Sequence, residues 1–193
     1  MNMRRYDWTT GGYDYLQALG MAPRNAAIAG YIIALAENPC TILDAACGLC
    51  PIFPFLPEKT VSRYVAFDNS QYVQDHLPYK EIAHFEFHRL TFQEFFSGSP
   101  DMSGSFDFVL YLGMYGGYDA YAERLEILLP YTKPGGYVIL EAIDDHIEDV
   151  LAVMRERHPD YKEIASCSIQ VRDVFMSDIT RERLRSIHVY HAP

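Results

Sequence analysis

The chain has 193 residues, of which 49% are hydrophobic, and its 26 acidic and 16 basic side chains give a formal net charge of −10. This length suits one domain covering residues 1–193, and the acidic charge argues against nucleic acid and membrane surfaces as partners, since both require clustered Lys and Arg. The N-terminal segment lacks a signal-peptide pattern, no apolar run could span a membrane, and four cysteines are too few for a disulfide scaffold, so we expect a cytoplasmic protein with reduced thiols.

Predicted helices and strands alternate along the chain. The first helix covers 26–38, with Asn25 as its cap and Pro39 as its stop. A short apolar run at 41–45 predicts a buried strand, and 51–57 predicts an irregular helical turn. Further strands are predicted at 63–68, 84–90, 105–113, 137–143, 161–175 and 181–192, and further helices at 69–78, 91–98, 118–132 and 144–159.

Strands that alternate with helices pair in parallel, so the chain is expected to form a doubly wound α/β sheet. The last two predicted strands follow one another with only a short connection, which indicates an antiparallel hairpin at the end of the sheet. In such sheets the ligand lies beyond the carboxyl ends of the strands, where the strand order reverses.

Four segments carry a resemblance to a known family: LDAACGLC (43–50), YVAFDNS (64–70), GSFDFVLYLGMYGGYD (104–119) and LLPYTKPGGYVIL (128–140). In this order they resemble the class I S-adenosylmethionine-dependent methyltransferases, over nearly the whole chain from about Asn25. The resemblance implies a mostly parallel seven-stranded sheet with a C-terminal hairpin, and S-adenosylmethionine as the cofactor, which leaves as S-adenosylhomocysteine.

The loop after the first strand is similar to the family's acid-x-Gly-x-Gly-x-Gly motif, but it keeps only Gly48. Ala46 and Cys50 stand where the other two glycines are usual. The resemblance implies that Asp44 orders this loop and the cofactor's ammonium group. Backbone N–H groups of such a turn lie close to the ligand, so the cofactor is expected to contact Ala46, Cys47 and Gly48.

Other cofactor contacts follow from the remaining segments. Asp68 ends the second strand, where an acid can accept hydrogen bonds from both ribose hydroxyls, and Asn69 follows it. Leu90 and Thr91 stand near the family's adenine position. Tyr111 and Gly113, at the end of the fourth strand, are expected near the methionine part of the cofactor.

The acceptor site is less clear from the sequence. The candidates for binding a small-molecule acceptor are Tyr13, Met114, Tyr115 and Tyr118. Tyr115, Glu141 and His146 are the catalytic candidates, with Tyr115 orienting the acceptor and the other two serving as bases. No metal site is expected. Residues 1–24 contain several aromatics and are a candidate lid over the cofactor, with a plain packing arm as the alternative.

The sequence therefore predicts a methyltransferase that acts on a small molecule. Two alternatives use the same fold. One is a reaction other than methyl transfer, either transfer of the aminocarboxypropyl group of the cofactor or a cyclisation, and the other is cofactor binding without catalysis. Because Cys47 and Cys50 form a CxxC between a strand and a helical segment, a thiol redox protein also stays open. A dinucleotide-binding protein is disfavoured, since no G-x-G-x-x-G follows the first strand.

Overall fold

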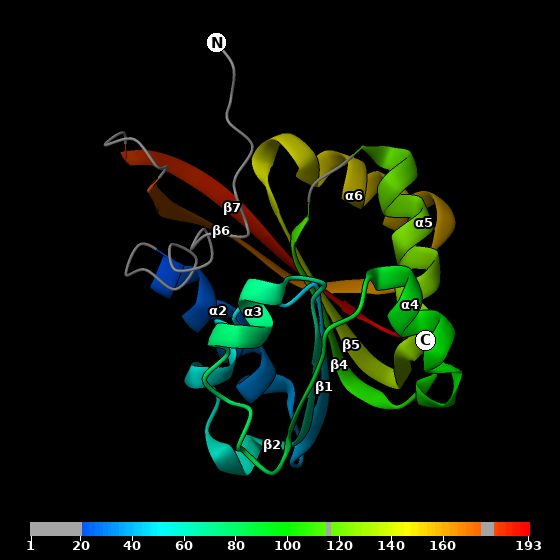
Figure 1. Ribbon diagram of the computed structural model, residues 1–193. Coiled ribbons are helices and arrows are strands. Elements are labelled where there is room, and N and C mark those ends of the chain that lie inside the picture. The colour runs from blue at the N-terminus through cyan, green and yellow to red at the C-terminus, as the bar shows by residue number, and fades with distance from the viewer. Residues whose placement is uncertain (1–20, 115–116, 175–179) are drawn as a thin grey trace.

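The computed structural model describes residues 21–114, 117–174 and 180–193. Seven strands form one sheet in the order β3-β2-β1-β4-β5-β7-β6 (Figure 1). The strands are β1 (Cys40–Ala45), β2 (Val61–Phe67), β3 (Phe85–His88), β4 (Phe106–Met114), β5 (Thr132–Ile143), β6 (Lys162–Val174) and β7 (Thr180–His191). All neighbours pair in parallel except β5–β7 and β6–β7, which are antiparallel. This is the predicted doubly wound sheet with its C-terminal hairpin.

Helices cover both faces of the sheet (Figure 1). One face carries α2 (Ala22–Leu35) and α3 (Gln71–His76), and the other carries α4 (Phe92–Gly98), α5 (Tyr118–Leu128) and α6 (Asp144–Arg157). Each layer buries its own core: Ile28 and Ile32 of α2 pack on the first face, whereas Phe95 of α4 and Leu125 of α5 pack on the second. Strands with apolar residues on both faces are typical of such buried parallel sheets.

The strand order reverses between β1 and β4. From β1 the chain moves outward to β2 and β3, then returns to the other side of β1 to form β4. In the register, Asp44 of β1 lies opposite Ala66 of β2 on one side and Leu110 of β4 on the other. The carboxyl ends of these strands therefore share one edge, which we call the carboxyl edge, and the switch point lies on it.

The structure corrects two element boundaries and agrees with the predicted irregular turn. The first helix begins at Ala22, so the predicted cap Asn25 lies in its first turn, where Asn25 Oδ1 accepts a hydrogen bond from Arg24. Residues 22–24 of the predicted lid thus belong to α2. The irregular helical turn predicted at 51–57 is present as a 3₁₀ turn at Phe53–Phe55, because Pro51 and Pro54 prevent a regular helix. Strand β5 begins at Thr132, before the predicted start at residue 137.

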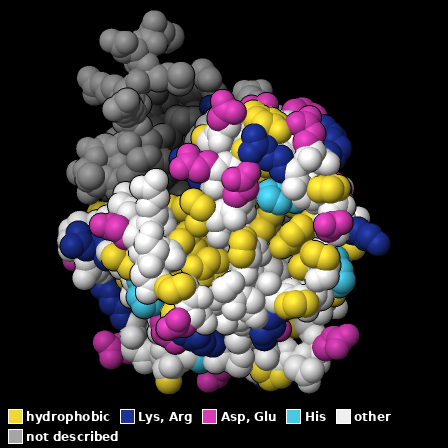
Figure 2. Space-filling model, turned by 90° about the vertical axis from the view of Figure 1, so that its right-hand side faces the viewer, with side chains coloured by type: hydrophobic (Ala, Val, Ile, Leu, Met, Phe, Trp, Pro, Cys, Tyr) yellow, Lys and Arg dark blue, Asp and Glu magenta, His cyan; other side chains and the backbone are white. Residues whose placement is uncertain are grey.

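The outer surface of the α4–α6 layer is mixed in character. Figure 2 shows hydrophobic side chains near the centre of this face, with acidic and basic groups around them. Among the described residues, the large hydrophobic side chains that are most exposed lie elsewhere, in α2, the 53–55 turn and the β6–β7 hairpin: Ile33, Phe55, Ile164 and Leu184. None of the described helices has the length and apolar character needed to cross a membrane.

Candidate active site

The loop after β1 adopts a left-handed backbone at three alternate positions. Ala46, Gly48 and Cys50 have φ angles of 54°, 55° and 51°. These are the positions that match the three glycines of the family motif, so the loop keeps the glycine conformation although two of the glycines are absent. An L-residue in this region costs roughly 1–2 kcal/mol relative to its usual conformations. The loop is therefore strained at Ala46 and at Cys50.

Cys47 and Cys50 are buried thiols in this loop, and both are free. Burial, followed by the neighbouring Cys50 thiol, raises the pKa of Cys47 well above its usual value, and burial also raises the pKa of Cys50. A reactive thiol requires the opposite conditions, namely access to solvent and a lowered pKa. These surroundings argue against the thiol redox alternative.

Asp68 links the carboxyl ends of β1 and β2. Its Oδ2 accepts a hydrogen bond from the Gly48 N–H at 3.0 Å, and its Oδ1 accepts one from the Ser70 N–H at 2.9 Å. Ser70 in turn caps α3. Both carboxylate oxygens of Asp68 are thus held in a fixed orientation by backbone N–H groups. The structure thus brings Gly48 and Asp68, 20 residues apart, into one cluster with Asn69 exposed beside it.

Asp44 lies under the loop, buried and only 1% exposed. The Tyr64 hydroxyl donates a hydrogen bond of 2.6 Å to Asp44 Oδ2. Burial raises the pKa of Asp44 to about 7, although Tyr64 and the charge of Arg24 act in the opposite direction. Within the described ranges no cation forms an ion pair with this carboxylate. A positive group that reached Asp44 would therefore be strongly favoured.

Glu141 of β5 is fully buried between two arginines. Arg24 of α2 contacts Oε2 at 2.8 Å, and Arg185 of β7 contacts Oε1 at 2.9 Å. The Gly113 N–H donates a third hydrogen bond, to Oε2, at 2.6 Å. Burial alone would raise the pKa of Glu141, but the two guanidinium groups lower it to about 2. A carboxylate with so low a pKa is a poor proton acceptor, which argues against the expected role of Glu141 as a base.

Gly113, which donates this hydrogen bond to Glu141, has an unusual backbone conformation. Its φ is 67°, and a register shift separates Leu112 from Met114. A Cβ at Gly113 would meet no atom of the described residues within 4 Å, so these residues leave space beside the backbone at the end of β4. Glu141 therefore holds a bend of the chain next to a space at the carboxyl edge.

Arg24 has an unsatisfied polar atom. Its Nη1 donates to Asn25 Oδ1 and its Nη2 to Glu141, whereas its buried Nε has no hydrogen-bond partner in the part of the chain that the structure describes. Buried donors are nearly always paired, so such an atom calls for an explanation. Arg24 also lies close enough to Asp44 to lower the pKa of that carboxylate.

The other predicted cofactor contacts are placed less directly. Leu90 is half-buried before α4, and Thr91 is the N-cap of α4, where its hydroxyl and the Glu94 carboxylate form a capping box. The Tyr111 ring is buried among residues of the α4–α6 layer, and its hydroxyl accepts a hydrogen bond from Arg124. The Tyr111 side chain thus lies in that core, and only its backbone belongs to the strand end.

The acceptor candidates are only partly described. Tyr13 and Tyr115 lie outside the described residues, as does the Met114 side chain. The Tyr118 hydroxyl donates to Glu156 of α6 at 2.6 Å, and its ring lies beneath Arg157, so this side chain is held against α6. His146 lies in the first turn of α6, partly exposed. Among the described residues no cluster of His, Cys, Asp or Glu could hold a metal ion.

Three residues of this site were missed in the sequence: Tyr64, Arg24 and Arg185. Tyr64 looks like an ordinary strand residue, and an arginine in an otherwise apolar helix gives no sign of its partner. The one available signal was a single charged residue in each of two apolar runs, Arg24 in α2 and Glu141 in the second half of β5.

The raised pKa of Asp44 predicts a pH-dependent stability. Between the unfolded value of 3.8 and about 7, the folded protein holds a proton that the unfolded chain releases, so the free energy of unfolding falls as the pH rises. Replacement Asp44→Asn removes this effect. Urea denaturation should find the variant and the wild type similar near pH 4, and the variant more stable by up to about 4 kcal/mol at pH 8. Parallel curves across this range would contradict the raised pKa.

Strain in the loop predicts a second effect. Ala46 is exposed, so Ala46→Gly relieves the left-handed conformation with little loss of packing and should stabilise the protein by up to about 1 kcal/mol after the backbone entropy of glycine is subtracted. Cys50→Gly gives the same relief but removes a fully buried side chain, so its net effect should be smaller or negative. Urea midpoints compare the two variants. A loss of more than 1 kcal/mol in Ala46→Gly argues against strain.

No protein-family model matches this sequence, and no curated protein sequence matches it either. Solved structures do match. A 1,6-didemethyltoxoflavin-N1-methyltransferase from Burkholderia thailandensis, with bound 1,6-didemethyltoxoflavin and S-adenosylhomocysteine, superposes with a TM-score of 0.62 at 15% identity, over 90% of this chain and 78% of that one.

A magnesium protoporphyrin IX methyltransferase from Synechocystis PCC 6803, with bound S-adenosylmethionine, gives a TM-score of 0.68 at 12% identity over 100% of both chains. An S-adenosylmethionine-dependent methyltransferase from Leishmania major gives 0.66 at 9% identity, over 96% of this chain and 78% of that one. At these identities the likeness concerns the fold. Together with the strand order and the C-terminal hairpin, it shows that the chain has the class I S-adenosylmethionine-dependent methyltransferase fold.

Proposed function

We propose that the protein is an S-adenosylmethionine-dependent methyltransferase with a small-molecule acceptor. The observation that carries the proposal is a pair of buried polar groups at the carboxyl edge that lack partners among the described residues. Among the described residues, the buried Asp44 has no ion-pair partner and the buried Nε of Arg24 has no hydrogen-bond partner. The methionine part of the cofactor ends in an ammonium and a carboxylate group, which match these two side chains in charge.

The other end of the cofactor has a matching partner. Asp68 lies on the neighbouring strand β2, with both oxygens anchored by backbone N–H groups. An anchored carboxylate suits the two ribose hydroxyls, because it accepts hydrogen bonds without losing further side-chain freedom. Asp68, Asp44 and Arg24 thus provide groups for the ribose, the ammonium and the carboxylate along one edge of the sheet.

When bound, the cofactor supplies a methyl group on a positively charged sulfur, which is already activated toward a nucleophile. The contribution of this chain would be to align the acceptor and to exclude water. Glu141 would be a positioning residue in this scheme, because it fixes the first turn of α2 through Arg24 and the bend at Gly113. His146 remains the candidate for a base among the described residues.

The choice of acceptor follows from charge. With a net charge of −10, the protein favours a small molecule over a nucleic acid, which needs a basic surface. Free cysteines favour a reducing compartment, the cytoplasm. Small-molecule acceptors are also named for the structural neighbours, toxoflavin and protoporphyrin compounds.

Calorimetry tests the cofactor first. We expect S-adenosylhomocysteine to bind and NAD not to bind. With an acceptor panel, methyl transfer should release S-adenosylhomocysteine, whereas aminocarboxypropyl transfer would release 5′-methylthioadenosine. Asp68→Asn should weaken S-adenosylhomocysteine by about 1–3 kcal/mol, since a charge-assisted hydrogen bond to the ribose is lost.

A ribose analogue separates this contact from damage to the loop. Wild-type protein should bind the 2′-deoxyribose form of S-adenosylhomocysteine more weakly than the parent compound, and Asp68→Asn should reduce this difference. If the variant discriminates between the two ligands as well as the wild type, Asp68 does not hold the ribose. Glu86→Gln, a half-buried acid on β3 that pairs with Arg63, is the matched control and should change neither affinity.

A second test concerns the amino-acid end of the cofactor. Arg24→Gln should weaken S-adenosylhomocysteine by about tenfold or more, because a charged hydrogen bond to its carboxylate disappears. It should leave 5′-methylthioadenosine, which lacks the amino-acid part, nearly unchanged. Arg185→Gln is the control, since it removes the other ion pair of Glu141. Equal weakening of both ligands in Arg24→Gln would mean that Arg24 acts only through the fold.

A further inference from the structure

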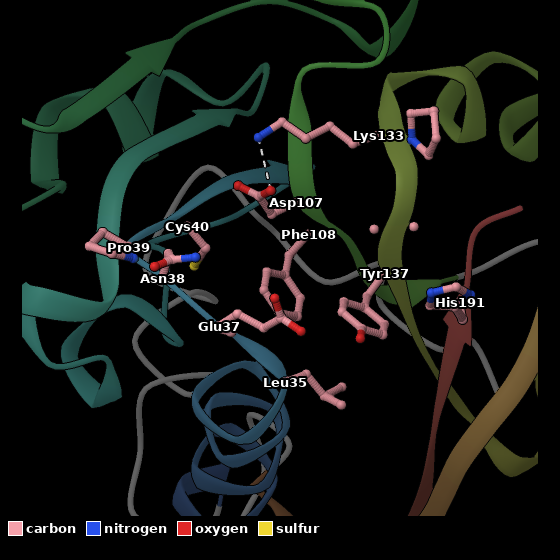
Figure 3. Close-up of a pocket in the computed structure, with 14 residues that line it drawn as sticks. Leu35, Glu37, Asn38, Pro39, Cys40, Asp107, Phe108, Lys133, Tyr137 and His191 are labelled. Atoms are coloured by element: carbon pink, nitrogen blue, oxygen red, sulfur yellow. Dashed lines mark hydrogen bonds and ion pairs between the residues drawn. The ribbon is translucent and has the colours of Figure 1, made fainter.

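A cavity of about 310 Å³ lies at the opposite edge of the sheet from the proposed cofactor site. It is lined by the last residue of α2, the turn that follows, the first residues of β1, β4 and β5, and His191 at the end of β7 (Figure 3). Because β1, β4 and β5 are parallel, their first residues mark the amino edge. We call this space the amino-edge cavity. Its volume is at the lower end of the range for small-molecule sites.

The electrostatics of this cavity are negative for two independent reasons. The first is the C-terminus of α2, a 14-residue helix that has no basic residue in its last turn. Its last carbonyl groups carry a partial negative charge and lack intrahelical partners. The second is Glu37, which comes two residues after the helix. An acid at this place is unfavourable for the helix itself, since like signs face each other.

The positive charge of Lys133 in the lining is already paired with an acidic side chain. Lys133 Nζ lies 2.8 Å from Asp107 Oδ1, and Asp107 Oδ2 also accepts hydrogen bonds from the N–H and the hydroxyl of Thr41. Lys133 and Asp107 thus neutralise each other at one side of the cavity, as Figure 3 shows. Glu37 is the one acid of the lining that forms no ion pair within the described residues.

The remaining lining provides an acceptor and apolar surface. Figure 3 shows the Glu37 side chain extending toward the ring of Tyr137, with Leu35 beside them. The Tyr137 ring stacks on Phe108, with centroids 5.3 Å apart, and meets the edge of His191. These contacts hold the Tyr137 ring in place, and its hydroxyl has no partner among the described residues.

We propose that the amino-edge cavity is a second binding site, specific for a small organic cation with an ammonium group and an apolar body. The ammonium group would lie between Glu37 and the C-terminus of α2, and the apolar body would contact Leu35 and the Tyr137 ring. A neutral or anionic ligand of the same shape would leave the charge of Glu37 uncompensated. The site is separate from the proposed cofactor site and does not depend on it.

Calorimetry of the intact protein with 2-phenylethylamine as the probe tests this site. Saturable binding is expected at low salt, at least tenfold tighter than that of the neutral 2-phenylethanol. Glu37→Gln should abolish this preference for the ammonium compound, and Glu37→Lys should reverse it in favour of 3-phenylpropionate. Glu58→Gln, an exposed acid outside the cavity, is the matched control and should bind as the wild type does.

Other outcomes would overturn the proposal. They are the absence of saturable 2-phenylethylamine binding, equal affinity for the amine and the alcohol, and undiminished amine binding in Glu37→Gln. Because Glu37 is exposed and makes no described contact, its variants are expected to fold, and an unchanged urea midpoint confirms this. Weakening of equal size in Glu58→Gln would show general attraction to an acidic protein and would also overturn the specific site.

Discussion

One buried carboxylate holds the proposed active site together. Glu141 of β5 binds Arg24 of α2, Arg185 of β7 and the backbone of Gly113 at the end of β4, so four segments meet at a single side chain. A buried carboxylate and two buried guanidinium groups are stable only when their hydrogen bonds are well formed. Loss of one partner from a buried ion pair typically costs about 3–5 kcal/mol of stability. This constraint fixes the start of α2, and with it Arg24, relative to the strand ends.

The loop after β1 is also held in its conformation by hydrogen bonds to another element of the sheet. Its backbone takes the left-handed conformation at Ala46, Gly48 and Cys50, although only one of them is glycine. The conformation persists because neighbouring groups demand it: Asp68 binds the Gly48 N–H, and Cys47 N–H donates to Phe67 O. Local strain is thus maintained by contacts from β2, as is common at functional sites.

The sequence was sufficient for the architecture because the relevant signals are local. Apolar runs, proline stops and the alternation of strands with helices predicted the doubly wound sheet and its C-terminal hairpin, and the structure confirms both. Element ends were less accurate, as at α2 and at β5, where packing overrides local signals. The carboxyl ends of β1 and β2 were also predictable neighbours, so Gly48 and Asp68 lie together.

The partners of Glu141 could not be found in this way. Arg24 is 117 residues before it and Arg185 is 44 residues after it, and no local pattern connects them. For the same reason Glu141 was taken as a base: its position near the end of a buried strand suggested access to the site, whereas its pKa depends on two arginines from distant elements. The electrostatics of a site require three-dimensional neighbours, and a single sequence does not give them.

The same long separations affect how the molecule assembles. Residue 24 leaves the ribosome well before β5, so its guanidinium group finds its partner only after β5 has formed, and Glu141 gains its second arginine only when β7 has docked. Because β7 lies between β5 and β6 although β6 comes first in the chain, the hairpin must add to the sheet with β7 inward. Contacts this distant in sequence are typical of slow folding. The carboxyl edge would then mature after the rest of this sheet.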